Sequence, residues 1–327
     1  MPEIIELIFS DLSAQFLSPR KRLFIGYLVC AFCIAVFWVC VTSRTGLKTA
    51  IAIVFAPAVW LSRSSLVDVI CFAINRLLFA LLRPVLLTQI TVATIVYQLL
   101  HLQVLMPIGA LKHVDYWIAA ATFTAFYFIF DDFSRFGVHY LMHRIPALWE
   151  FHKFHHSAET LTPLTVTRTH PIEGLIFLIR TVAVQGVTIA LFVGLFGSKV
   201  DLLTIYGVGI FGLLFHSLGS NLRHSHIAIR YPAALERIFI SPAQHQLHHS
   251  RDPRHFDRNF GVVLAIWDRL LGSFHPSTDE EISYGLGPAD AGYTKSVWSM
   301  YWFPFVALFR RLTRFRPRYP KGFERLR

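Results

Sequence analysis

The sequence predicts an all-α integral membrane protein, with several transmembrane helices and a histidine-rich helical cap on the cytoplasmic side of the membrane. Composition is the first observation: 54% of the 327 residues are hydrophobic and 16% are charged, whereas a soluble domain has about 25% charged residues. The second is the grouping of apolar residues in runs, several of which approach the roughly 20 residues that a spanning helix needs. The third is a set of histidine clusters in the polar stretches between those runs.

Five apolar runs are expected to cross the membrane: Leu23–Val41, Pro84–Met106, Tyr116–Phe130, Ile172–Phe196 and Leu202–Phe215. The run Leu47–Leu61 is short and contains a proline, so we expect a kinked return or a re-entrant segment there. The run Leu66–Leu82 contains Asp68, Asn75 and Arg76. Because charged and amide groups are costly in lipid, this segment is expected to pack against protein or to lie at the interface.

Eight of the 16 histidines fall in three short boxes, one of the form HxxxH and two of the form HxxHH: His139 and His143; His152, His155 and His156; His245, His248 and His249. Neutral imidazole is the commonest metal-binding side chain and suits zinc, copper and iron. Eight imidazoles are too many for one ion of roughly four to six ligands. The boxes therefore predict two metal ions in one nitrogen-rich pocket.

The spacing within each box predicts how the rings are presented. His139 and His143 share one helix face if the helix that holds Tyr116–Phe130 continues past the membrane interface. In an HxxHH box on a helix, the first two histidines lie on one face and the third is rotated by about 100° from the second. Such a box can reach two ions.

Three isolated histidines are further ligand candidates. His224 follows a membrane span in a polar stretch and is the favoured ninth ligand, while His226 beside it and His170 before a span are possible ligands. Carboxylates near the boxes are expected to accept the second ring N–H and so to orient the rings. These carboxylates are Asp131, Asp132, Glu150, Glu173 and Asp268.

Charge distribution predicts the side on which the boxes lie. If the second and third boxes share metal ions, the chain between them must cross the membrane and return to the same side. The turn between those two spans carries only Lys199 and Asp201, whereas the side of the boxes is rich in arginine: Arg223, Arg230, Arg237, Arg251, Arg254, Arg258 and Arg269. This asymmetry places the boxes on the cytoplasmic face. The net charge of +11 is scattered between apolar runs and in the C-terminal tail, so anionic lipid headgroups are the expected partner and nucleic acid is not.

The chain resembles the fatty acid hydroxylase superfamily, which includes the sterol desaturase family, from about Asp131 to Pro276. The resemblance is carried by the three boxes and by the phrases LRHSH (222–226), SPAQHQLHHS (241–250) and NFGVVLAIWDRLLG (259–272). It implies a catalytic region at 111–276, preceded by a membrane region of uncertain topology at 1–110 and followed by a basic, membrane-associated tail at 277–327.

The resemblance also implies an activity and a cofactor. The expected centre holds two iron ions, with zinc as a possible substitute in purified protein, and uses O2 to hydroxylate or desaturate a membrane lipid such as a sterol, a fatty acyl chain or an isoprenoid. By position, the eight box histidines and His224 would be the ligands. The expected location is a bacterial inner membrane or the endoplasmic reticulum.

Electrons are expected from an external donor, because the sequence has neither a haem-binding His-Pro-Gly-Gly motif nor a nucleotide-binding fingerprint. A cytochrome b5-like protein or a ferredoxin-type chain would serve, and exposed Arg251, Arg254 and Arg258 could bind such an acidic carrier.

Two alternatives from other functional classes stay open. One is a superfamily member without catalytic activity that binds lipid. The other is a membrane metal transporter, which would place its ligands inside the spans near the middle of the bilayer.

Overall fold

The computed structural model describes residues 2–82, 89–102, 109–200, 209–287, 290 and 292–314. These residues form helices and no strand, apart from two isolated bridges, so the all-α prediction is confirmed. The α-helices are α1 (Pro2–Leu17), α2 (Ile25–Thr42), α3 (Leu47–Val54), α4 (Pro57–Trp60), α5 (Arg63–Leu82), α6 (Gln89–Leu102), α7 (Tyr116–Arg144), α8 (Pro146–His156), α9 (Pro171–Phe196), α11 (Gly209–Ser217), α12 (Ala233–Glu236), α13 (Pro242–His248), α14 (Ile266–Leu271) and α15 (Val297–Arg314). The short 3₁₀ helices are η2 (Pro163–Thr167), η3 (Gly197–Lys199), η4 (Ser220–His224), η5 (Pro253–His255) and η7 (Tyr293–Lys295).

Three helices in the described parts of the chain are long and apolar enough to cross a membrane: α2, α5 and α9. Helices α2 and α9 coincide with the predicted runs Leu23–Val41 and Ile172–Phe196. Helix α7 continues without a break from Tyr116 to Arg144, which confirms that the helix carrying the first box extends beyond its apolar run. The predicted spans Pro84–Met106 and Leu202–Phe215 lie partly outside the described residues, which contain only α6 and α11 of those two runs.

Helix α5 differs from the sequence-based expectation in one respect. Its length and hydropathy match those of a spanning helix, although the polar residues in its sequence argued against a span. The reason is their direction: Asp68 and Asn75 are buried against the protein, while Leu66 and Val69 are exposed. The expectation that this segment packs against protein is therefore confirmed, because its polar groups contact the segment that follows α8.

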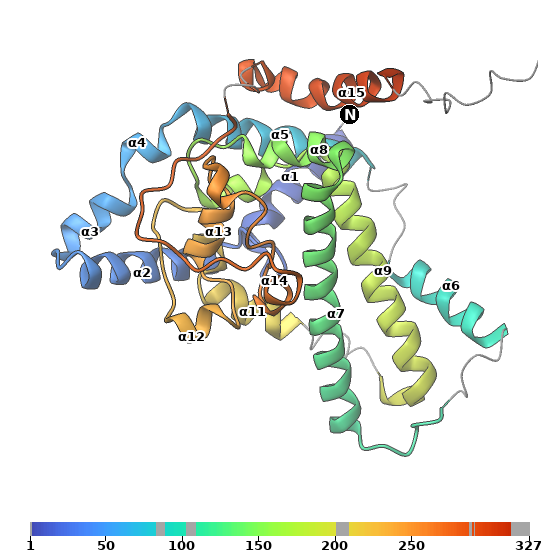
Figure 1. Ribbon diagram of the computed structural model, residues 1–327. Helices are drawn as coiled ribbons and strands as arrows, with labels where there is room; N and C mark the ends of the chain where they lie inside the picture. Colours follow the sequence, from blue (N-terminus) through green and yellow to red (C-terminus); the bar gives the residue numbers. More distant parts are fainter. Residues whose placement is uncertain are drawn as a thin grey trace, which may run out of the picture.

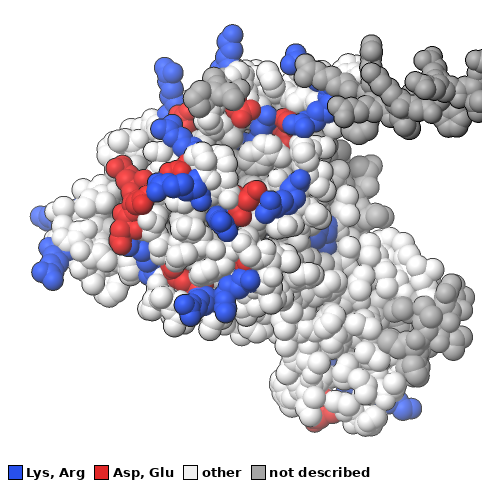
Figure 2. All heavy atoms as spheres, in the orientation of Figure 1, with Lys and Arg blue, Asp and Glu red and all other residues white. Residues whose placement is uncertain are grey.

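Two long helices extend from a compact cap (Figure 1). Helix α7 packs against α9, and α6 covers the other side of α9. A close approach of α6 requires Gly186, since a Cβ at this position would lie 2.8 Å from Val92. Charged side chains gather over the cap, whereas the part formed by α6, α7 and α9 is almost uncharged except near its far tip (Figure 2). This division matches a lipid-facing region and a water-facing cap.

Prolines begin the helices that carry or support the boxes. Pro146 follows the end of α7 and is the first residue of α8, Pro171 is the first residue of α9, and Pro242 is the first residue of α13. Proline suits the first helical position because it needs no backbone donor there. Ser241 strengthens the start of α13 by accepting the backbone N–H of Gln244, whose side chain bonds back to the N–H of Ser241. The second and third boxes therefore lie on short helices with fixed starting points, whereas the first lies near the C-terminal end of the long helix α7.

A buried ion pair joins α5 to the segment after α8. Asp68 Oδ1 lies 3.1 Å from Arg168 Nη1, and Asp68 Oδ2 accepts the hydroxyl of Thr165 at 2.6 Å. Arg168 also donates to the backbone carbonyl and side chain of Ser157, directly after the second box. The pair fixes the chain on both sides of η2.

Replacing Asp68 with asparagine should destabilise the protein, because it leaves the buried guanidinium of Arg168 without a countercharge. Loss of one partner of a buried pair costs about 3–5 kcal/mol, so the apparent melting temperature in detergent should fall by several degrees. Asp279→Asn is the matched control, since the Asp279 side chain is 89% exposed. Equal melting of D68N and the wild type would contradict this role.

Candidate metal centre

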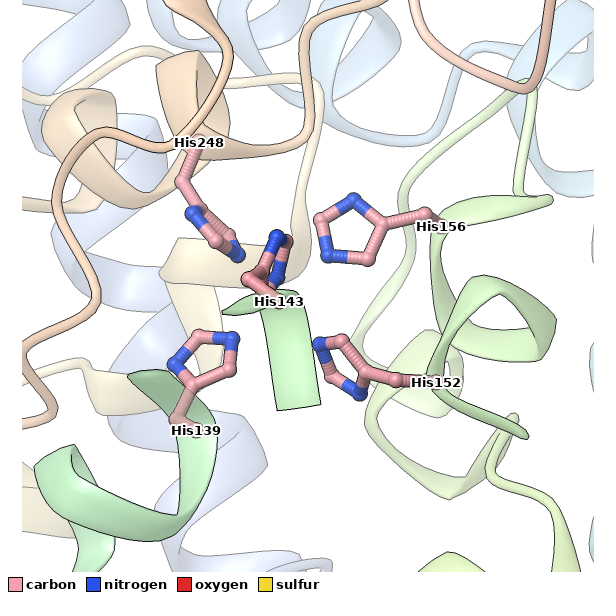
Figure 3. A group of neighbouring side chains, drawn as sticks. All are labelled: His139, His143, His152, His156 and His248. Carbon is pink, nitrogen blue, oxygen red and sulfur yellow. The ribbon is translucent and has the colours of Figure 1, made fainter. Parts of the chain in front are cut away.

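Nine buried or nearly buried histidines converge in the cap and form two groups. The first, which we call the five-histidine group, contains His139, His143, His152, His156 and His248. Their rings point toward one another from α7, α8 and α13 (Figure 3). Each offers one nitrogen, and these nitrogens all lie within 4.8 Å of one another. A single metal ion could be held among them.

The second, four-histidine group contains His155, His224, His245 and His249, again with one nitrogen from each within 4.8 Å of the others. Nε2 of His224 lies 3.1 Å from Nε2 of His155 and 3.1 Å from Nε2 of His245. The two groups are neighbours, because the rings of His156 and His249 stack with centroids 4.6 Å apart.

Both HxxHH boxes are divided between the groups, as the two-ion interpretation requires, but in each box the division differs from the predicted one, which placed the first two histidines together. His152 and His156, which are four residues apart, belong to one group, and His155 belongs to the other. One helical turn separates His152 from His156, so their rings lie one above the other on α8. In the third box, His248 joins the five-histidine group while His245 and His249 join the other.

Several ring nitrogens in the two groups have no hydrogen-bond partner in the described part of the protein. This is true of Nε2 in His143, His152, His156 and His248, and of both ring nitrogens of His249. Buried polar atoms normally find a partner, and a site for an ion is one accepted reason for an exception. Several such nitrogens converging on one point fit a bound cation, so the donor set fits two metal ions.

The protonation state of these rings also suits metal binding. Burial lowers the pKa of His139 to about 4 and that of His155 to about 3. The pKa of His156 lies well below its ordinary value, first because the ring is buried and second because His249 lies beside it. Since the neutral imidazole is the form that binds metals, the rings are in the binding form at neutral pH.

In three of these histidines, the ring nitrogen opposite the inward-facing Nε2 lies close to an oxygen atom of the protein. His152 Nδ1 lies 2.9 Å from a carboxylate oxygen of buried Glu173. Backbone carbonyls serve the others: that of Phe260 lies 2.8 Å from His139 Nδ1, and that of Arg258 lies 2.7 Å from His248 Nδ1. These contacts fix the tautomer that leaves Nε2 free to bind a metal.

Two buried carboxylates position the loop that provides two of these carbonyls. Asp268 accepts the backbone N–H groups of Phe260 and Gly261, each at 2.8 Å. Asp132, on α7, accepts the backbone N–H of Val263 at 2.9 Å and the indole N–H of Trp267 at 2.9 Å. A side chain at Gly261 would meet Asp268 Oδ2 at 2.7 Å, so only glycine permits this approach.

Of the five carboxylates expected to orient the rings, only Glu173 contacts a box histidine through a hydrogen bond. Asp132 and Asp268 instead accept backbone N–H groups of the loop whose carbonyls contact the rings. Asp131 instead pairs with Arg135 and Arg180. Glu150 pairs with Lys153 and Arg311 on the outer side of α8.

The isolated histidines are divided by the structure. His224 lies within the four-histidine group, whereas His170 and His226 lie outside both groups. His170 caps α9 by accepting the N–H of Ile172, and its Nε2 lies 3.0 Å from the carbonyl of Tyr301. Nε2 of His226 lies 3.0 Å from the carbonyl of Ile53.

Sequence reasoning missed the backbone acceptors and one cation. The carbonyls of Arg168, Arg258 and Phe260 hold three of the rings, and a backbone group carries no residue-type signal. Arg22 Nη2 lies 3.5 Å from His224 Nδ1 although the two are 202 residues apart. Only the basic cluster at residues 20–22 in the sequence could have drawn attention to it.

Burial raises the pKa of Glu173, but a bound cation would favour the ionised carboxylate beside His152. Replacing Glu173 with glutamine should therefore weaken metal binding in the five-histidine group, because it removes the group whose negative charge would make His152 a stronger ligand. Loss of such an outer partner typically lowers metal affinity by about 10- to 100-fold. Chelator competition followed by metal analysis would measure the effect. Glu150→Gln is the matched control, since Glu150 is also buried but faces Lys153 and Arg311. Equal affinity in E173Q and E150Q would contradict the assignment.

Comparison with known proteins agrees with this geometry. Residues 124–273 match the family model for fatty acid hydroxylase. Alkylglycerol monooxygenase of Danio rerio is 29% identical over 56% of this chain and 37% of its own length. Ornithine lipid hydroxylase OlsE of Rhizobium tropici is 30% identical over 45% of this chain and 40% of its own, and Delta(7)-sterol 5(6)-desaturase of Eremothecium gossypii is 26% identical over 58% and 46%.

The chain thus covers less than half the length of each of these relatives. No solved structure matches it significantly. The matched segment contains all nine histidines of the two groups. Residues 124–273, which hold both histidine groups, are therefore similar to the fatty acid hydroxylase family.

Proposed function

We propose that this protein is an O2-dependent membrane oxidoreductase that hydroxylates or desaturates a lipid. The observation that carries the proposal is the pair of adjacent, all-histidine groups inside a segment that is similar to the fatty acid hydroxylase family. The named substrates or products of the relatives are an alkylglycerol, an ornithine lipid and a sterol, so a lipid is the substrate class that fits best.

Two iron ions are the metals we assign to the groups, with nine histidine ligands: His139, His143, His152, His155, His156, His224, His245, His248 and His249. Nitrogen donors suit iron and zinc better than magnesium or calcium. Bound iron would supply the redox chemistry that O2 needs to oxidise an unactivated C–H bond, which zinc would not supply.

The chain's own residues orient the ligands and exclude water. Glu173 and the carbonyls of Phe260 and Arg258 hold three rings of the five-histidine group in place. Phe260 and Trp149 pack against the rings, with centroids 5.0 Å from that of His143 in each case. An apolar surround of this kind limits side reactions with solvent.

The proposed orientation places the histidine groups on the cytoplasmic face of the membrane, with residues 111–276 as the catalytic region. Support comes from the position of the groups at the cap end of α7, outside the apolar part of that helix. A transporter would hold its ligands near the middle of the bilayer, so this position argues against that alternative.

Electrons would come from a separate acidic carrier that binds near the third box. Arg251 and Arg254 are exposed on this surface, and the backbone carbonyl of nearby Arg258 contacts His248. The distance between the binding surface and the five-histidine group is therefore short.

Iron-loaded protein in lipid nanodiscs, supplied with a chemical reductant, should consume O2 in a lipid-dependent manner and release a hydroxylated or desaturated lipid. Mass spectrometry of extracted lipids would identify the product. Replacement of the ligand pair His152 and His248 with alanine should abolish the lipid-dependent part of the O2 uptake. The Arg230→Gln variant, which is altered in an exposed ion pair, is the control.

Two results would contradict the proposal. Full iron loading without lipid-dependent O2 uptake would favour the lipid-binding alternative. Lipid oxidation that is unchanged in the alanine variant would remove the histidine groups from the chemistry.

A further inference from the structure

A large cavity lies apart from both histidine groups, between α6, α7, α9 and α11. Its volume is about 900 Å³, and none of the nine histidines lines it. Most of the lining is apolar and comes from all four helices: Ile90, Phe128, Ile189, Val193, Phe211 and Leu213. A cavity of this size and lining suits a hydrocarbon chain.

One end of the cavity is polar and basic. Arg20, Asp131, Asp132, Arg135 and His216 line it. Asp131 lies between two guanidinium groups, with one carboxylate oxygen 2.8 Å from Arg135 Nε and the other 2.8 Å from Arg180 Nη1. A single carboxylate therefore serves two arginines, and positive charge is left over.

Two further arginines, Arg22 and Arg223, lie next to residues of this polar end but do not line the cavity themselves. Arg223 places its guanidinium 4.9 Å from the ring centroid of Phe215, a lining residue. Arg22 donates to the side chain of Asn221 at 3.1 Å. Neither forms an ion pair with any carboxylate in the described ranges; their hydrogen bonds go to neutral oxygens and, for Arg22, also to Nδ1 of His224.

The arginines described above lie around the same region, the polar end of the cavity. His216, at the polar end, lies within electrostatic range of Arg22, Arg135 and Arg223. The nearby carboxylate of Asp132 is already engaged by backbone N–H groups and the Trp267 indole. We call this region, formed by Arg20, Arg22, Arg135 and Arg223, the arginine end of the cavity.

The arginine end is also the end nearer to the histidines. Arg135 precedes His139 by four residues on α7, a rise of about 6 Å along the helix. Val193 at the apolar end lies 20 residues after Glu173 on α9, which corresponds to about 30 Å. Since Glu173 contacts His152, the cavity runs from near the histidine groups into the apolar part of the protein.

We propose that the cavity binds a lipid with an anionic headgroup, a phosphate or a carboxylate, held at the arginine end, with its hydrocarbon chain extending between α6, α7 and α9 toward Val193. Guanidinium groups bind such anions through charge-assisted, often bidentate hydrogen bonds. The inference rests on the proposed function only in taking the bound lipid as the substrate, whose carbons near the headgroup then lie closest to the histidines.

Binding can be measured with two probes that differ only in a phosphate group. Palmitoyl lysophosphatidic acid and monopalmitoylglycerol share one chain, and each is titrated into the metal-loaded protein in detergent, without reductant, by calorimetry. The phosphate probe should bind about tenfold or more tightly, the gain expected from a charged hydrogen bond. Arg135→Gln should remove most of this preference, while Arg230→Gln, in an exposed pair with Asp279, should keep it. A melting curve of each variant checks that it is folded.

Equal binding of the two probes, or an unchanged preference in R135Q, would overturn the proposal. Competition by inorganic phosphate at the same concentration as the lipid probe would also overturn it, because the site would then bind free phosphate rather than a lipid. The experiment involves no turnover. A protein that binds the anionic lipid but never consumes O2 would therefore support this inference while contradicting the proposed function.

Discussion

The burial of nine uncharged imidazoles at close contact is the constraint on which the rest of the structure depends. Their inward nitrogens lie within 4.8 Å of one another in each group, and several lack any partner in the described part of the chain. Each buried, unsatisfied polar atom costs about 1–3 kcal/mol. Protonation does not relieve this cost, because burial lowers the pKa of these rings. A divalent cation in each group would satisfy one nitrogen of every ring at once.

The rest of the cap serves to hold the rings in this arrangement. The boxes come together from α7, α8 and α13, of which α8 and α13 begin with a proline. Buried Asp132 and Asp268 fix a loop whose carbonyl at Phe260 orients His139, and the Asp68–Arg168 pair fixes the carbonyl that contacts His155. Asp132 and Asp268 bind backbone N–H groups and Asp68 binds the Arg168 side chain, so the precision of the centre depends on residues outside the ligand set.

Much of this could be predicted from sequence, because the relevant signals are local. HxxxH on a continuing helix and HxxHH boxes too rich in histidine for one ion led to two groups of ligands, and the polar stretch around His224 identified the ninth. The placement of His155 apart from His152 could not be predicted. It depends on the direction from which η4 and α13 approach α8, which is a long-range property. Backbone acceptors such as the carbonyl of Arg258 cannot be recognised from residue type. The arginine end could not be predicted either, because it brings together residues 22 and 223, which are far apart in the sequence.

Metal analysis of group-specific variants tests the central claim most directly. The account predicts about two ions per wild-type chain, and loss of about one when either group is disrupted, by His152→Ala with His248→Ala or by His224→Ala with His249→Ala. All four substitutions together should leave none. A wild-type chain that binds a single ion, or metal content unchanged by disruption of either group, would contradict the account.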